Sequence, residues 1–199
     1  MEPEEAPVVF GEASEAMRHE AMEDRVATYR ERSSQLLARA SSATSVEYPQ
    51  CIQTLTTVAA HLLDGGEYME AWGILRFLVS ETRVSAGLEH QESLKALNEA
   101  TTSLLSIQRA KLLCDALPHA EFGEQSAILE LLHALGPDAM PAMLQLNAAY
   151  YLGPTLRRSL FAVMENAGEK AGDVLAEYLR ANKTRLHRLT PLIEILGTL

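Results

Sequence analysis

Apolar residues recur in the C-terminal part of the chain in a fixed pattern that ends each time at a glycine, Gly136, Gly168 or Gly197. Counted back from each glycine, the first, fourth, fifth and eighth positions are apolar. Spacings of three and four residues place these positions on one face of an α-helix. The glycines are 32 and 29 residues apart, an interval that predicts one helical hairpin repeated along the chain. The apolar positions are Ile128, Leu131, Leu132 and Leu135, then Leu160, Val163, Met164 and Ala167, then Leu189, Leu192, Ile193 and Leu196.

The residues after the glycines predict the second helix of each hairpin. Ala139 and Ala171 stand three residues after the first two glycines, and Met143 and Leu175 follow four residues later. Each hairpin can bury its apolar stripe only against a neighbour. The pattern therefore predicts an all-α protein in which residues 120–199 stack as a right-handed α-α superhelix. Helices are expected near 120–135, 138–151, 154–167, 170–181 and 184–196.

Before the repeats, helix-period apolar stripes predict a bundle of long helical hairpins over residues 16–117. Gly65-Gly66, Gly87 and Pro118 mark the expected helix ends, because glycine adopts a positive φ easily and proline disfavours a helix before it. The first 12 residues contain two prolines and four glutamates, and we expect residues 1–15 to be an acidic, disordered N-terminus. Helices are expected near 16–40, 46–63, 67–85 and 88–117.

The run from Ile128 to Ala139 resembles a HEAT repeat of the short kind known from phycobilisome lyases. Its apolar positions are followed by Gly-Pro-Asp-Ala, and residues 160–171 repeat the pattern with Gly168 and Ala171 in the same places. The resemblance covers about 80 residues and implies a HEAT-like array of helical hairpins. Because such repeats serve scaffolds, adaptors and lyases alike, the resemblance implies no single activity.

A second resemblance lies near residues 55–85. Ala59, Gly66, Tyr68 and Ala71 are similar to the small, Gly, Tyr, Ala signature of a tetratricopeptide hairpin. In that family the small residues let the two helices approach closely. The pattern has no second copy in the chain, so the resemblance implies one hairpin of this kind.

The third copy of the repeat stripe, residues 189–196, is followed only by the last three residues of the sequence. Its second helix is missing, so its apolar face would have no neighbour within the array. We expect the chain to be part of a longer repeat protein, or this face to be covered by another molecule. Self-association through the C-terminal repeat is therefore one expected property.

The chain carries a formal net charge of −10, and this charge is spread unevenly. Residues 1–24 hold eight acids and one base, whereas residues 154–199 hold five acids and seven bases. This balance disfavours nucleic acid binding over the whole surface and allows a local anion site. No stretch of 18 apolar residues occurs, so no membrane span is expected. The acidic N-terminus and the two distant cysteines, Cys51 and Cys114, favour a cytoplasmic protein with reduced thiols.

Basic residues in the repeats are the best candidates for binding a partner. Arg157 and Arg185 stand near the beginnings of consecutive first helices and could line one edge of the array. Tyr150-Tyr151 ends a second repeat helix and offers aromatic contact area. For the basic cluster, a solvated edge, an acidic protein partner and nucleic acid are the alternatives, and the lack of interleaved aromatic residues disfavours nucleic acid. The candidate residues are Arg157, Arg158, Arg180, Lys183, Arg185, Arg188, Tyr150 and Tyr151.

The sequence contains no recognisable catalytic, cofactor-binding or metal-binding pattern. HEAT-like hydroxylases use His-Glu pairs, one per repeat, as iron ligands, but the one such pair here, His19-Glu20, lies outside the repeats. No glycine-rich phosphate loop and no Cys/His nucleophile pair can be recognised. We therefore predict a non-catalytic scaffold or adaptor that binds an unidentified protein and needs no cofactor. A HEAT-like lyase or hydroxylase, and a nucleic-acid-binding protein, are the alternatives.

Overall fold

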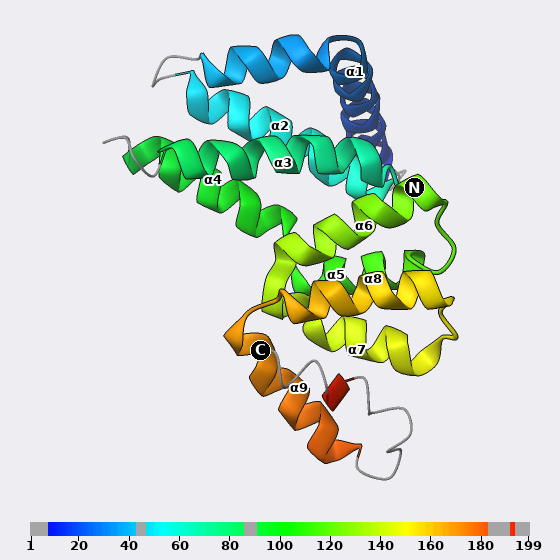
Figure 1. Ribbon diagram of the computed structural model, residues 1–199. Coiled ribbons are helices and arrows are strands. Elements are labelled where there is room, and N and C mark those ends of the chain that lie inside the picture. The colour runs from blue at the N-terminus through cyan, green and yellow to red at the C-terminus, as the bar shows by residue number, and fades with distance from the viewer. Residues whose placement is uncertain (1–7, 43–46, 86–90, 183–191, 194–199) are drawn as a thin grey trace, which may run out of the picture. The chain divides into compact units, whose positions relative to one another are not determined.

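The computed structural model describes residues 8–42, 47–85, 91–182 and 192–193. Within these ranges all regular structure is helical, and no strand occurs (Figure 1). The prediction of an all-α protein is thus confirmed for the described part of the chain. The predicted last repeat helix, residues 184–196, falls almost entirely outside the described ranges.

The chain divides into two compact units, Met1–Ala100 and Thr101–Leu199. The sequence analysis placed the boundary between residues 117 and 120, whereas the structure places it within the helix Gln91–Leu104. The first unit contains α1 (Val8–Ser41), α2 (Tyr48–Asp64), α3 (Tyr68–Ser85) and most of α4 (Gln91–Leu104).

Helix α1 is longer than predicted and is interrupted once. It begins at Val8, within the segment 1–15 that the sequence analysis expected to be disordered, while residues 1–7 lie outside the described residues. After Pro7 the sequence has no proline until Pro49, and glutamate and alanine, which favour helices, dominate residues 12–21. Arg32 has φ −130° and ψ 23°, next to a pair of serines that weakens the helical ladder.

Helices α2 and α3 form the hairpin around which the first unit is built. The two helices pack against each other, and Ile52 and Leu62 from α2 and Leu78 from α3 are almost fully buried. Gly66 has φ +83° in the connection, a conformation that favours glycine. Of the tetratricopeptide-like positions, Ala59 and Ala71 are buried as close helix packing requires, but the family assignment stays a prediction.

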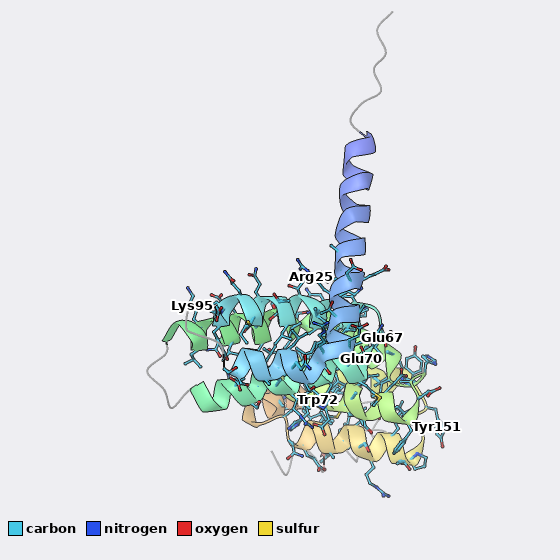
Figure 2. The ribbon with its side chains drawn as sticks, turned by 90° about the horizontal axis from the view of Figure 1, so that it is seen from above. Arg25, Glu67, Glu70, Trp72, Lys95 and Tyr151 are labelled. Atoms are coloured by element: carbon cyan, nitrogen blue, oxygen red, sulfur yellow. The ribbon has the colours of Figure 1, made fainter. Side chains whose placement is uncertain are left out.

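Charged and hydroxyl groups join α1 to α3. Arg30 donates from Nε to both carboxylate oxygens of Glu70, at 2.9 and 3.2 Å, and its Nη2 lies 3.2 Å from Glu67 Oε1. The two glutamates are labelled in Figure 2. Tyr29 is buried beside them, and a Cβ on Gly73 would lie 3.7 Å from its hydroxyl oxygen. Burial, and then the charge of Glu70, raise the pKa of Tyr29. The tyrosine is therefore held as a neutral phenol in the packed interface.

Near the start of the second unit lies a helix break that the sequence analysis missed. The predicted single helix 88–117 is two helices, because α4 ends at Leu104 and α5 begins at Ile107. Ser106 has extended backbone and its Oγ accepts a hydrogen bond from the Arg109 N–H at 3.3 Å, which is the geometry of an N-cap. The further elements of this unit are α5 (Ile107–Ala116), α6 (Phe122–Leu135), the 3₁₀ helix η1 (Gly136–Ala139), α7 (Met140–Ala149), α8 (Pro154–Glu165) and α9 (Glu169–Ala181).

The helices of the second unit pack in two layers. In one layer α5 lies against α7, and α7 against α9; in the other, α6 lies against α8 (Figure 1). The hairpin α6–α7 therefore contacts the next hairpin, α8–α9, through both of its helices, and α7 also contacts α8. This packing brings the first helix of one predicted hairpin, α6, next to the first helix of the following one, α8. A right-handed superhelix and membership of the HEAT-like repeats remain predictions.

The repeated apolar positions are the core of this unit. Ile128, Leu131 and Leu132 from the first copy are nearly inaccessible to solvent, as are Leu160 and Met164 from the second. The alanines and large residues after the glycines are buried in the same way: Ala139, Met143, Ala171 and Leu175. Of the third copy, only Leu192 and Ile193 are described, and they are 1% and 51% exposed. The predicted uncapped face therefore stays a prediction.

Gly136 and Gly168 turn the chain at equivalent points of the two repeats. Their φ values are +59° and +85°, where a side chain is strained. Gly136 is the first residue of η1, and Gly168 directly precedes α9. A Cβ on Gly136 would lie 4.0 Å from the carbonyl oxygen of Ala167, which precedes the other glycine. The recurrence of glycine thus reflects a backbone requirement at the end of each first helix.

We expect Gly168→Ala to lower the free energy of unfolding by about 1–3 kcal/mol, because only glycine adopts this backbone conformation without strain. Gly153→Ala is the matched control: its φ is −58° and nothing lies within 4 Å of the added Cβ. The control should stay within about 0.5 kcal/mol of the parent in urea denaturation followed by circular dichroism. Equal stability of the two variants would contradict the role given to Gly168.

The two thiols provide a second test of the core. Both cysteines are free, and burial, followed by the charge of Asp115, raises the pKa of the Cys114 thiol from 9.0 to about 12. Between these pH values the unfolded chain releases a proton that the folded chain keeps, so stability should fall as pH rises. Urea denaturation at pH 8 and pH 10 should show a smaller loss in Cys114→Ala than in the parent or in Cys51→Ala. A loss of the same size in all three proteins would refute the buried thiol.

Candidate functional site

The second unit has a concave site of about 580 Å³ where the end of α7, the following loop, α8 and α9 meet. It combines aromatic rings, amides, one cation and small apolar groups. Its walls are formed by Asn147, Ala148, Ala149, Tyr150, Tyr151, Leu152, Arg157, Tyr178, Asn182 and Leu192. We call this hollow the α7–α9 site.

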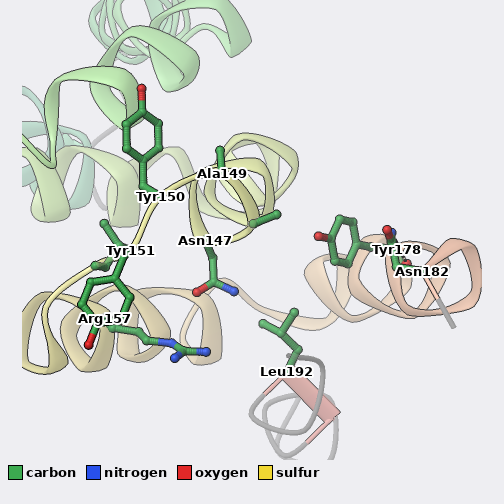
Figure 3. Close-up of a pocket in the computed structure, with 10 residues that line it drawn as sticks. Asn147, Ala149, Tyr150, Tyr151, Arg157, Tyr178, Asn182 and Leu192 are labelled. Atoms are coloured by element: carbon green, nitrogen blue, oxygen red, sulfur yellow. Dashed lines mark hydrogen bonds between the residues drawn. The ribbon is translucent and has the colours of Figure 1, made fainter. Parts of the chain in front are cut away.

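The polar side chains of the α7–α9 site come from three different helices (Figure 3). Arg157 extends along the site from α8, Asn147 points into it from the end of α7, and the hydroxyl of Tyr178 points toward it from α9. Asn182 donates from Nδ2 to the carbonyl oxygen of Tyr178 at 2.9 Å and so closes the end of α9. The helix packing therefore places an amide, a guanidinium and a phenol around one space.

Arg157 is the cation of this site, and its guanidinium is incompletely satisfied. Its Cζ lies 5.2 Å from the centre of the Phe161 ring, a cation–π contact one helical turn along α8. Its Nε is shielded from solvent and has no hydrogen-bond partner. No ion pair involving Arg157 occurs among the described residues. A buried donor without an acceptor costs about 1–3 kcal/mol, so an added acceptor would be stabilising here.

A second hollow of about 480 Å³ lies along α8 and shares residues with the first. Tyr151, Leu152 and Arg157 line both hollows. The second, which we call the α8 hollow, is completed by Pro154, Arg158, Phe161, Ala162 and Glu165. The shared residues make the two hollows neighbouring parts of one surface groove, with Arg157 between them.

The structure brings together some of the predicted partner-binding residues. Tyr151 is 96% exposed and stands beside Arg157, and Arg158 lines only the α8 hollow. Tyr150 contributes to the wall of the α7–α9 site, but its ring turns away and meets His119 edge to face, with the centroids 6.1 Å apart (Figure 3). Arg180 is exposed on α9 and lines neither hollow. Lys183, Arg185 and Arg188 lie outside the described residues.

Sequence reasoning missed Asn147 and Tyr178. They follow Gly136 and Gly168 by eleven and ten residues, so they occupy nearly the same position of two consecutive second helices. Aligning the second helices for polar positions as well as apolar ones would have found them. The first-helix pattern alone could not, because it describes only the buried face.

The first unit has a hollow of its own, about 450 Å³, between α1 and α2. Tyr29, Leu36, Leu55 and Val58 make it largely apolar, and Cys51 lines it with a half-buried thiol. Across the ranges that the structure describes, no three His, Cys, Asp or Glu side chains gather closely enough to hold a metal ion. No helix in those ranges has the length and apolar character that crossing a membrane requires.

Comparison with protein-family models, with curated proteins and with solved structures finds no significant match for this chain.

Proposed function

We propose that the protein is a non-catalytic scaffold or adaptor, and that the groove formed by the α7–α9 site and the α8 hollow is where it contacts a protein partner. The observation that carries this proposal is the exposed Tyr151 beside an incompletely satisfied Arg157 in a concave surface. Tyrosine and arginine are the residue types enriched in the energetically important parts of protein interfaces.

The two-layer packing supports this proposal. Stacked helices present side chains from consecutive second helices side by side, as Asn147 on α7 and Tyr178 on α9 demonstrate. A surface assembled this way can offer several separate contacts to one partner without any moving part. Its groove is open to solvent, which suits a segment of another protein.

Photo-crosslinking can test the proposed contact. With p-benzoylphenylalanine in place of Tyr151, irradiation of cells that naturally make the protein should give discrete protein adducts of higher mass. The matched control is the same substitution at Phe122, which is 80% exposed, begins α6 and lines neither hollow. Because Tyr151 lies in the groove and Phe122 does not line it, we expect adducts from position 151 at several times the yield from position 122.

Adducts of equal yield at both positions, or none at either, would contradict a binding surface in this groove. Circular dichroism of both variants should match the parent, since both replaced side chains are solvent-exposed.

A further inference from the structure

We propose that the groove binds an extended peptide segment of the partner in which one carboxylate pairs with Arg157 and a neighbouring apolar side chain lies against Phe161. This inference rests on the proposed function and names the chemistry of its partner. It commits the groove to a segment with a single acid, not to a polyacidic run.

The carboxylate is assigned from the state of the Arg157 guanidinium. Figure 3 shows its outer nitrogens extending into the α7–α9 site, where a carboxylate can accept hydrogen bonds without any rearrangement. The unpartnered Nε lies on the covered side of the same group. A small rotation of the side chain would let the carboxylate bond side-on to Nε and one outer nitrogen, the paired geometry that carboxylates and guanidinium groups prefer.

The neighbouring apolar side chain is assigned from the α8 hollow. Pro154, Phe161 and Ala162 give this hollow an apolar wall that begins where the Arg157 contact ends. Tyr151 and Leu152 line both hollows, so a chain crossing from one to the other stays in contact with them. Side chains two residues apart in an extended chain point to the same face and lie about 6.6 Å apart along it, so such a pair can reach the two hollows.

The main chain of such a segment also finds polar partners. The amide of Asn147 and the hydroxyl of Tyr178 face the α7–α9 site, and within the described residues neither makes a side-chain hydrogen bond. An amide offers both a donor and an acceptor, which matches the carbonyl and N–H of a peptide unit. The side-chain amide of Asn182 already donates a hydrogen bond to the Tyr178 carbonyl oxygen, so Asn182 only lines the site.

The local charge favours one carboxylate over a nucleic acid. Among the described residues that line the α7–α9 site, Arg157 is the one basic residue. The second unit as a whole, residues 101–199, holds nine bases and ten acids, so it carries no excess of positive charge. Proteins that bind DNA through its backbone commonly contact about 6–10 phosphates, which a single arginine cannot provide.

The test is a titration of the ¹⁵N-labelled protein, followed by NMR, with the blocked peptide acetyl-Gly-Phe-Gly-Glu-Gly-amide and with its counterpart containing Gln in place of Glu. We expect the glutamate peptide to shift the Arg157 Nε–H resonance saturably and the glutamine peptide to bind about tenfold more weakly, because a charge-assisted hydrogen bond is lost. Arg157→Gln should remove the difference between the two peptides. Arg157→Lys, which keeps the charge but not the planar fork, should keep part of it. Arg180→Gln, at an exposed arginine of α9 that lines neither hollow, should leave the preference for glutamate intact.

The outcomes separate this inference from the proposed function. Equal binding of both peptides, or a glutamate preference that survives Arg157→Gln, would overturn the carboxylate contact, while shifts in the groove would still support a protein-binding surface. No shift in the groove with either peptide, together with no crosslinks from position 151, would overturn both. Saturable shifts of the groove with a 12-base-pair DNA duplex that fall steeply with salt would assign the site to nucleic acid instead.

Discussion

The second unit depends on one constraint: each helical hairpin must bury its apolar stripe against the next. The stripe of α6 meets the stripe of α8, and side chains such as Leu132, Leu160 and Met164 are almost completely removed from water. Each such side chain contributes about 1.5–3 kcal/mol when fully buried, but one hairpin alone has no surface to bury it on. The spacing between hairpins is therefore set by the core. Everything on the surface, including the distance from Asn147 to Tyr178, follows from that spacing.

The sequence predicts this core well because burial and helical period act together. The apolar positions from Ile128 to Ala139 could be placed on an inner face without any structure, whereas the positive φ of Gly136 became known only from the structure. The helix break at Ser106 was harder to predict. Leu104, Leu105 and Ile107 continue the apolar run across it, and a single serine gives little warning that the backbone leaves the helix there. In the structure Ile107 is 64% exposed, so the residue that extended the apparent stripe is not part of the core.

The groove was only half predictable, for a physical reason. Tyr151 and Arg157 stand out in the sequence as an aromatic residue and a base close to a helix start. Whether these two side chains lie side by side depends on the direction in which the loop 150–153 leaves α7. The residue types alone do not predict that direction. Tyr150 demonstrates the point: it is chemically the same as its neighbour, yet its ring packs on His119 while Tyr151 is left in solvent.

The position of the boundary between the two units has a practical consequence for dissecting the chain. Ala100 lies inside α4, a helix of 14 residues, so cutting there would leave pieces shorter than the about 12 residues that an isolated helix needs. Ser106, two residues after the end of α4, is the N-cap of α5. Arg109 of α5 donates from Nη1 to the carbonyl oxygens of Ser103 and Leu104. A cut between Leu105 and Ser106 leaves both helices whole and keeps the Ser106 cap, and it gives up only the two Arg109 side-chain hydrogen bonds. Fragments intended for separate expression should therefore end and begin at that bond.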